Sequence, residues 1–133
     1  MNVIISLLIP ALIAVESGGN IAAIGDHGNA VGCLQIRAEC IADVNRLSKT
    51  TYTQSDRLSR EKSEEMCRLY LTHYGNAYKR RTGKEPTAET LARIWNGGPR
   101  GYSNHKTARY WAKVQAEQTK QDKARRTQDR ATR

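Results

Sequence analysis

The chain has 133 residues, 38% of them hydrophobic, which fits one compact domain with one core and leaves too little for a second. Lys and Arg number 22 against 13 Asp and Glu, and the net charge of +9 favours a polyanion: nucleic acid, an anionic membrane surface or an acidic cell wall. A nucleic-acid partner would favour basic residues interleaved with exposed aromatics, or a recognisable binding motif, whereas the basic excess here is spread over 57–81 and the tail, so we expect no nucleic-acid partner.

The N-terminal segment, Met1–Ala14, is the most apolar part of the chain. It lacks the basic start of a signal peptide, and it is too short, and interrupted by Pro10, for a membrane span. We therefore predict neither. The segment is instead typical of a buried helix from about Asn2 to Ser17, bent or restarted at Pro10. The glycine-rich stretch Gly18–Gly32 predicts a long loop with at most a small irregular hairpin.

Two helices are predicted in the middle of the chain. The first covers about Ala38–Leu47, with Ile41 and Val44 facing inward and Arg46 outward. The second starts at residue 56 or 59 and ends at Arg81, before Gly83. Its apolar residues recur at three-and-four spacing and predict one buried stripe: Met66, Leu69, Tyr70, His73, Tyr74 and Ala77.

Two further helices are predicted in the last third. Thr87 caps a short helix that packs Leu91, Ile94 and Trp95 inward and stops at Gly97-Gly98-Pro99. The last begins near Ser103 and gives way to a polar tail, 116–133, which we expect to be frayed or disordered. Nowhere does strand-length alternation appear, so we predict a mainly α, single-domain protein with a cleft.

The chain has three cysteines, Cys33, Cys40 and Cys67, and they cannot all pair internally. Together with His27 they lack the close paired spacing of a zinc site. We expect buried free thiols with at most one disulfide, no metal and no cofactor.

Glu16 stands where the apolar helix meets Gly18-Gly19. Burial penalises the ionised carboxylate, and the partial negative charge of the helix C-terminus acts in the same direction, so both raise its pKa. A carboxyl that keeps its proton near neutral pH is suited to protonate a leaving oxygen, as in glycoside cleavage. A partly exposed Glu at a fraying helix end is the alternative.

Four motifs occur in order: Glu16-Ser17-Gly18-Gly19-Asn20, Gly32-Cys33-Leu34-Gln35-Ile36, Ile94-Trp95-Asn96-Gly97-Gly98 and 107–114, TARYWAKV. Together they resemble the signature of lytic transglycosylases with the soluble-lytic-transglycosylase catalytic domain, relatives of goose-type lysozyme that cleave peptidoglycan. The short, phage-type members are the most similar. The resemblance implies a lysozyme-like catalytic domain over 1–115, with peptidoglycan glycan strands as partner and a monomeric state.

The resemblance also assigns roles. Glu16 would protonate the oxygen between N-acetylmuramic acid and N-acetylglucosamine and then deprotonate the sugar's own C6 hydroxyl, which leaves a 1,6-anhydro ring and needs no second carboxylate. Tyr110 would hold the Glu16 carboxyl, or else pack as part of an amphipathic helix. Ser17 would orient the carboxyl or the substrate, or else bond its own backbone.

Substrate contacts follow in the same way. Gln35 would line the cleft and bond sugar hydroxyls or an N-acetyl group, with a surface loop Gln as the alternative. Asn96 and Gly97 belong to the third motif, in which Trp95 stands where the family has Tyr. Trp95 would stack on a sugar or pack in the core.

Two other functions stay open. Asp26, in Asp26-His27-Gly28-Asn29, resembles a stretch of goose-type lysozymes whose aspartates activate water, although Arg37 stands where those enzymes often place another aspartate. The chain would then hydrolyse the same bond; a turn-forming Asp26 is the alternative. The second open function is that of a non-catalytic protein that binds the cell wall. We expect action in the bacterial cell wall or periplasm, after phage lysis, virion entry or dedicated secretion.

Overall fold

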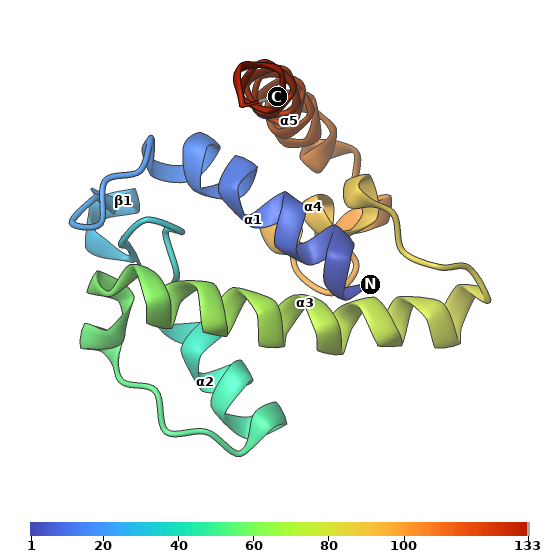
Figure 1. Ribbon diagram of the computed structural model, residues 1–133. Coiled ribbons are helices and arrows are strands. Elements are labelled where there is room, and N and C mark those ends of the chain that lie inside the picture. The colour runs from blue at the N-terminus through green and yellow to red at the C-terminus, as the bar shows by residue number, and fades with distance from the viewer. Residues whose placement is uncertain (133) are drawn as a thin grey trace.

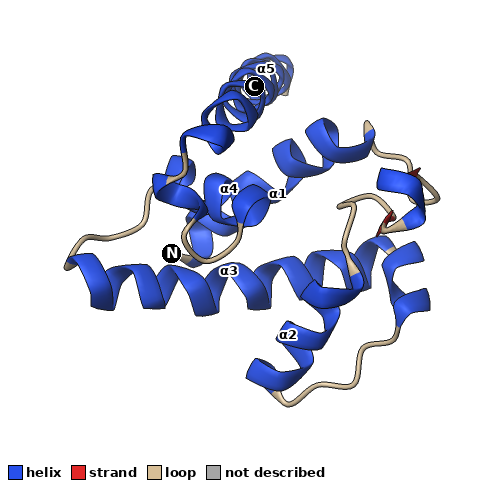
Figure 2. Cartoon of the chain, turned by 180° about the vertical axis from the view of Figure 1, so that it is seen from behind, coloured by secondary structure: helices blue, strands red, loops and turns tan. Residues whose placement is uncertain are grey.

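The computed structural model describes residues 1–132 and is built almost wholly of helices (Figure 2). The five α-helices are α1 (Asn2–Ser17), α2 (Ala38–Ser48), α3 (Arg60–Thr82), α4 (Ala88–Gly97) and α5 (Ala108–Ala131). Strands β1 (Ile24–Gly25) and β2 (Ala30–Val31) form an antiparallel hairpin. Short 3-10 helices fill the connections: η1 (Asp26–Gly28), η2 (Gln54–Leu58), η3 (Gly101–Ser103) and η4 (His105–Thr107). The predicted mainly helical single domain with a small hairpin is confirmed.

Helix α3 runs through the molecule, with α2 on one side and α1 and α4 on the other (Figure 1). Helix α1 supplies the longest row of buried side chains: Ile5, Leu8, Ile9, Ala11, Leu12 and Ile13. They meet Met66 and Leu71 of α3, Ile94 of α4 and Val114 of α5 in one hydrophobic core. Because α1 is apolar on most sides, it packs against three helices, and this burial holds its last turn, with Glu16, inside the domain.

The helix ends follow their local sequence. Gly18 and Gly83 end α1 and α3 in the left-handed conformation, and Thr87 caps α4 by accepting a hydrogen bond from the Thr90 N–H. The prediction was a helix bent or restarted at Pro10; α1 does not restart but runs continuously through Pro10, which lies on its exposed face.

The loop after the hairpin is held by Arg57 of η2, which is in turn bonded to the first turn of α3. Gly32 has a φ of +86°, and a side chain there would collide with the backbone carbonyl of Arg57. The buried Arg57 guanidinium donates to the Ile36 carbonyl at 3.0 Å, while the Ser63 hydroxyl donates to the Arg57 carbonyl at 3.1 Å. These contacts fix the loop that carries Gln35.

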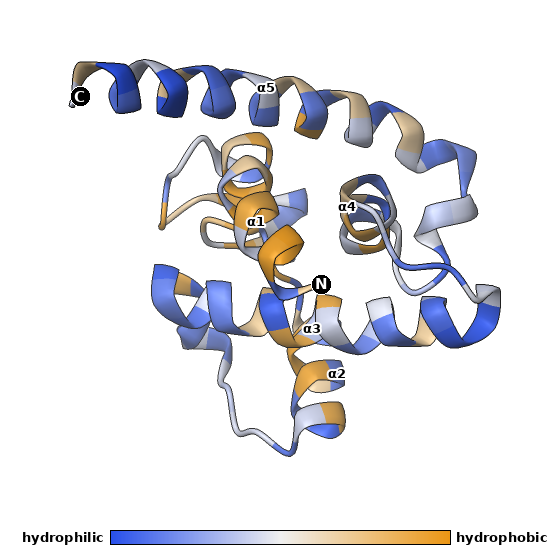
Figure 3. Ribbon diagram, turned by 45° about the vertical axis from the view of Figure 1, so that its right-hand side comes forward, coloured by the Kyte–Doolittle hydropathy of each residue, from blue (hydrophilic) through white to orange (hydrophobic). Residues whose placement is uncertain are grey.

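The C-terminal segment differs from its prediction. In place of a frayed tail, α5 continues to Ala131 with its outer half exposed and mostly hydrophilic (Figure 3). Residues 108–131 contain neither Gly nor Pro. Ion pairs at i,i+3 spacing, Lys120 with Glu117 and Arg125 with Asp122, add local support. Helix propensity and these ion pairs therefore account for the outer half of α5, which is exposed and has no apolar stripe packed against the core. Arg133 lies outside the described residues.

Cys33, Cys40 and Cys67 are all free thiols, as predicted, with Cys33 and Cys67 buried and Cys40 half-buried. Within residues 1–132, no helix is long and apolar enough to cross a membrane, and no group of acidic, His and Cys side chains is arranged to hold a metal ion.

Candidate active site

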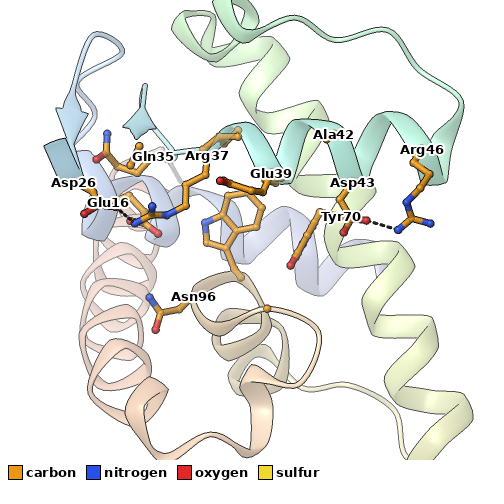
Figure 4. Close-up of a pocket in the computed structure, with 15 residues that line it drawn as sticks. Glu16, Asp26, Gln35, Arg37, Glu39, Ala42, Asp43, Arg46, Tyr70 and Asn96 are labelled. Carbon is orange, nitrogen blue, oxygen red and sulfur yellow. Dashed lines mark hydrogen bonds and ion pairs between the residues drawn. The ribbon is translucent and has the colours of Figure 1, made fainter. Parts of the chain in front are cut away.

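A cleft of about 870 Å³ lies between α2 and the C-terminal end of α4 (Figure 4). Glu16 from the last turn of α1 and Asp26 from the hairpin line one end of it, together with Gln35. Helix α4 contributes Trp95 and Asn96. The structure therefore brings five of the predicted site residues into one cavity, although they are spread over most of the sequence.

Glu16 has the electrostatics expected of a general acid. Its pKa is raised from 4.5 to about 7, chiefly because burial penalises the charged form. The Tyr110 hydroxyl donates to Glu16 Oε2 at 2.9 Å. This bond, the indole N–H of Trp95 and the positive charge of Arg37 each lower that pKa, but they do not offset the burial. Near neutral pH the Glu16 carboxyl is thus part protonated and part ionised.

Tyr110 reaches Glu16 because α5 packs across α1, which brings together residues far apart in sequence. Burial and the neighbouring Glu16 raise the pKa of the Tyr110 hydroxyl, so it stays a neutral donor. It therefore holds the carboxyl in one orientation, as the sequence motif predicts.

Asp26 lies at the same end of the cleft and forms an ion pair with Arg37 (Figure 4). Both side chains are partly exposed, at 44% and 51% respectively. Since the charge of Arg37 also acts on Glu16, one guanidinium lies beside both carboxyl groups. Asp26 has a φ of +48° and His27 one of +55°. Both residues are therefore in the left-handed region, as in a tight turn, and Asp26 is part of that turn as well as of the cleft.

The side chains of Gln35 and Ser17 form hydrogen bonds with backbone groups around the cleft. The Gln35 amide donates to the carbonyls of Ala23 at 3.2 Å and Gly32 at 3.0 Å, although the residue also lines the cleft. The Ser17 hydroxyl donates to the Cys33 carbonyl at 2.8 Å and accepts from the Gly19 N–H at 3.1 Å. Ser17 thereby joins α1 to the Gln35 loop, a contact that the sequence did not predict. The same hydroxyl also lies 3.2 Å from the Ile13 carbonyl of its own helix, which is the predicted backbone-bonding alternative.

The α4 end supplies neutral groups. Trp95 lines the cleft and meets the buried Tyr70 edge-on, with 5.5 Å between ring centroids. Asn96 is exposed at the cleft. Gly97 lies behind it, where a side chain would press on the Thr107 methyl group, so Gly97 allows close packing and does not line the cavity.

Helix α2 supplies residues that the sequence did not point to. Glu39, Cys40, Asp43 and Arg46 line the cleft, and the outward-facing Arg46 lies at its far end. Their spacing of three and four residues places them on one helix face, a signal visible in the sequence once α2 is known to border the cleft.

No family model matches the chain. Lysozyme 1 of Crassostrea virginica is 50% identical over 44 residues, which is 33% of this chain and 24% of that protein. A chain in the crystal structure of Aeromonas hydrophila PliI in complex with Meretrix lusoria lysozyme is also similar, with a TM-score of 0.68 and 25% identity. That match covers 83% of this chain and 87% of the other. The present chain has a lysozyme-like fold, and a third of its length is similar in sequence to a lysozyme, of which it spans about a quarter.

Proposed function

We propose that this protein cleaves the β-1,4 bond between N-acetylmuramic acid and N-acetylglucosamine in peptidoglycan, with Glu16 as the acid. The observation that carries the proposal is the Glu16 carboxyl, whose pKa is raised to about 7 by burial at one end of a long cleft. A group with that pKa holds a proton at neutral pH and gives it up readily, as a general acid requires. The partial match to an oyster lysozyme supports the substrate class.

In the hydrolytic form of the reaction, the protonated Glu16 donates its proton to the glycosidic oxygen as the bond to the sugar C1 breaks. Water attacks C1 and loses a proton to the Asp26 carboxylate, which gives a reducing end. The lysozyme relationship and the shared position of Asp26 and Glu16 at one end of the cleft favour this outcome. Arg37 keeps the Asp26 side chain oriented through their ion pair.

The second candidate is a lytic transglycosylase reaction. Glu16, once ionised, takes the proton from the C6 hydroxyl of the muramic acid, and that oxygen closes onto C1 to form a 1,6-anhydro ring. The Arg37–Asp26 ion pair favours this candidate, because a carboxylate already engaged by a guanidinium is less free to act on water. The ordered sequence motifs favour it as well.

Mass spectrometry of the muropeptides released from purified peptidoglycan tests the proposal, with wild type and Glu16→Gln compared. Reducing ends lost in the variant establish hydrolysis, and anhydro ends lost in the variant establish the transglycosylase. Glu61→Gln, which changes an exposed carboxylate on α3 away from the cleft, is the matched control and should release products normally. If wild type releases nothing, the protein is a binder and the proposal fails. We further propose that it acts at the bacterial cell wall or periplasm, where the charge of +9 favours the anionic polymer.

A further inference from the structure

The two sides of the cleft differ in chemistry. The α4 side presents Trp95 and Asn96, with Tyr70 of α3 behind them, which are aromatic or amide groups without charge. The α2 side, which we call the α2 wall, is charged. Figure 4 shows its four charged residues following one another from the Glu16 end: Arg37, which caps α2, and then Glu39, Asp43 and Arg46.

The sugars of a glycan strand are chemically complementary to the α4 side of the cleft only. These sugars carry hydroxyl and N-acetyl groups, which pair with aromatic faces and amides. The charged groups of peptidoglycan are the carboxylates and amines of the short peptide attached to the lactyl group of each muramic acid. The α2 wall therefore matches the peptide and not the sugars.

Arg46 is the member of this wall best prepared for an anion. It donates through Nη2 to Asp43 Oδ1, three residues earlier on α2, and the other Asp43 oxygen accepts from the Tyr74 hydroxyl of α3. Asp43 is thus held from two directions, with a side chain only 23% exposed, while Arg46 is 68% exposed. The contact holds the guanidinium at the cleft, and its exposure leaves N–H donors accessible to a ligand.

We propose that Arg46 forms a binding site for a carboxylate of the stem peptide of peptidoglycan, at the end of the cleft remote from Glu16 and Asp26. The inference rests on the proposed function. Guanidinium groups bind carboxylates through paired hydrogen bonds, and Asp43 and Tyr74 hold this one in place. The site would align a peptide-bearing strand along the α2 wall and contribute to substrate binding without touching the reacting atoms.

The first test measures steady-state cleavage of two substrates: intact peptidoglycan strands, and the same strands freed of peptide by an amidase, with the lactyl carboxylate that this exposes blocked as its methylamide. With Arg46→Ala we expect KM for the intact strands to rise about tenfold, as for a lost charge-assisted hydrogen bond, with kcat unchanged. KM for the peptide-free strands should not change. Arg46→Lys should recover part of the loss. Arg80→Ala, an exposed arginine on α3 away from the cleft, removes the same charge and controls for long-range attraction.

Equal effects of Arg46→Ala on both substrates, or none on either, would overturn the inference while leaving the proposed function intact. A direct measurement covers the case in which the protein does not cleave glycan. N-acetylmuramyl-L-alanyl-D-glutamate is titrated into the protein and followed by amide chemical shifts. Saturable shifts at α2 that vanish in Arg46→Ala, and with the diamide of the same ligand, support the site. Their absence in wild type refutes it.

Discussion

Glu16 is predicted to make the protein less stable at alkaline pH, and removing its charge should reverse the effect. In the folded state its pKa is about 7, against 4.5 for an ordinary glutamate. Between these values the folded state binds more protons at this site than the unfolded state does. The free energy of unfolding therefore falls as pH rises from about 4.5 to about 7, and it levels off above the folded-state pKa, where both states are ionised.

The size of the effect follows from the pKa values. One pKa unit corresponds to about 1.4 kcal/mol, so Glu16 ionisation costs about 3 kcal/mol at pH 8. That is a large share of the 5–15 kcal/mol by which domains of about this size are stable. Glu16→Gln removes the ionisable group and keeps an oxygen that accepts from Tyr110. The variant should match wild type near pH 4 and exceed it by up to about 3 kcal/mol at pH 8.

Urea unfolding of wild type and Glu16→Gln from pH 4 to pH 8 checks this prediction. The difference between the two proteins isolates Glu16, because every other titrating group is shared. Glu39→Gln, at an exposed position in the same cleft, should follow wild type at every pH. A Glu16→Gln difference that is flat across this range, or a variant less stable at pH 8, would show that burial does not govern the Glu16 carboxyl.

Three further predictions concern single residues. Tyr110→Phe removes a hydrogen bond that lowers the pKa of Glu16, so the alkaline limb of the pH–rate profile should move to higher pH, whereas an unmoved limb would separate Tyr110 from the acid. Asp26→Asn should lower the release of reducing ends at least about a hundredfold if Asp26 is the base, and leave anhydro products intact if the reaction is a transglycosylase one, as muropeptide mass spectrometry will show. Gly32→Ala should destabilise the fold by about 3 kcal/mol or more in urea unfolding, because a side chain there meets the Arg57 carbonyl at a positive φ; a change below about 1 kcal/mol would contradict that contact.

The sequence predicted the parts of the fold that local rules control. Helices α1 to α4 lie close to their expected bounds, because glycine end signals, the Thr87 cap and the three-and-four spacing are properties of short segments. The tail was predicted wrongly as frayed because the expectation depended on an apolar stripe. Helix α5 instead extends through residues of good helix propensity with ion pairs along its surface.

The candidate site divides in the same way. Glu16, Gln35 and Asn96 line the cleft, and the sequence pointed to them because each belongs to a short motif and the motifs occur in a particular order. The sequence did not predict the structural roles of Ser17 and Gly97. Ser17 bonds the distant Cys33 carbonyl and Gly97 packs against Thr107, and both contacts depend on the tertiary fold. A residue type at a motif position identifies the neighbourhood of a site without fixing which partner its side chain takes.

The α2 wall shows why such information is lost. Asp43 and Arg46 are three residues apart on a helix, and by sequence alone they form an ordinary surface ion pair, worth little to stability. Only the packing of α2 on α3 gives Asp43 the Tyr74 hydroxyl as a second partner and places the pair at the cleft. The same two side chains thus change from a solvated pair into an oriented guanidinium through a contact 31 residues away. At one end of the cleft burial holds a proton on Glu16, and at the other Asp43 fixes the direction of a positive charge; the fold sets both.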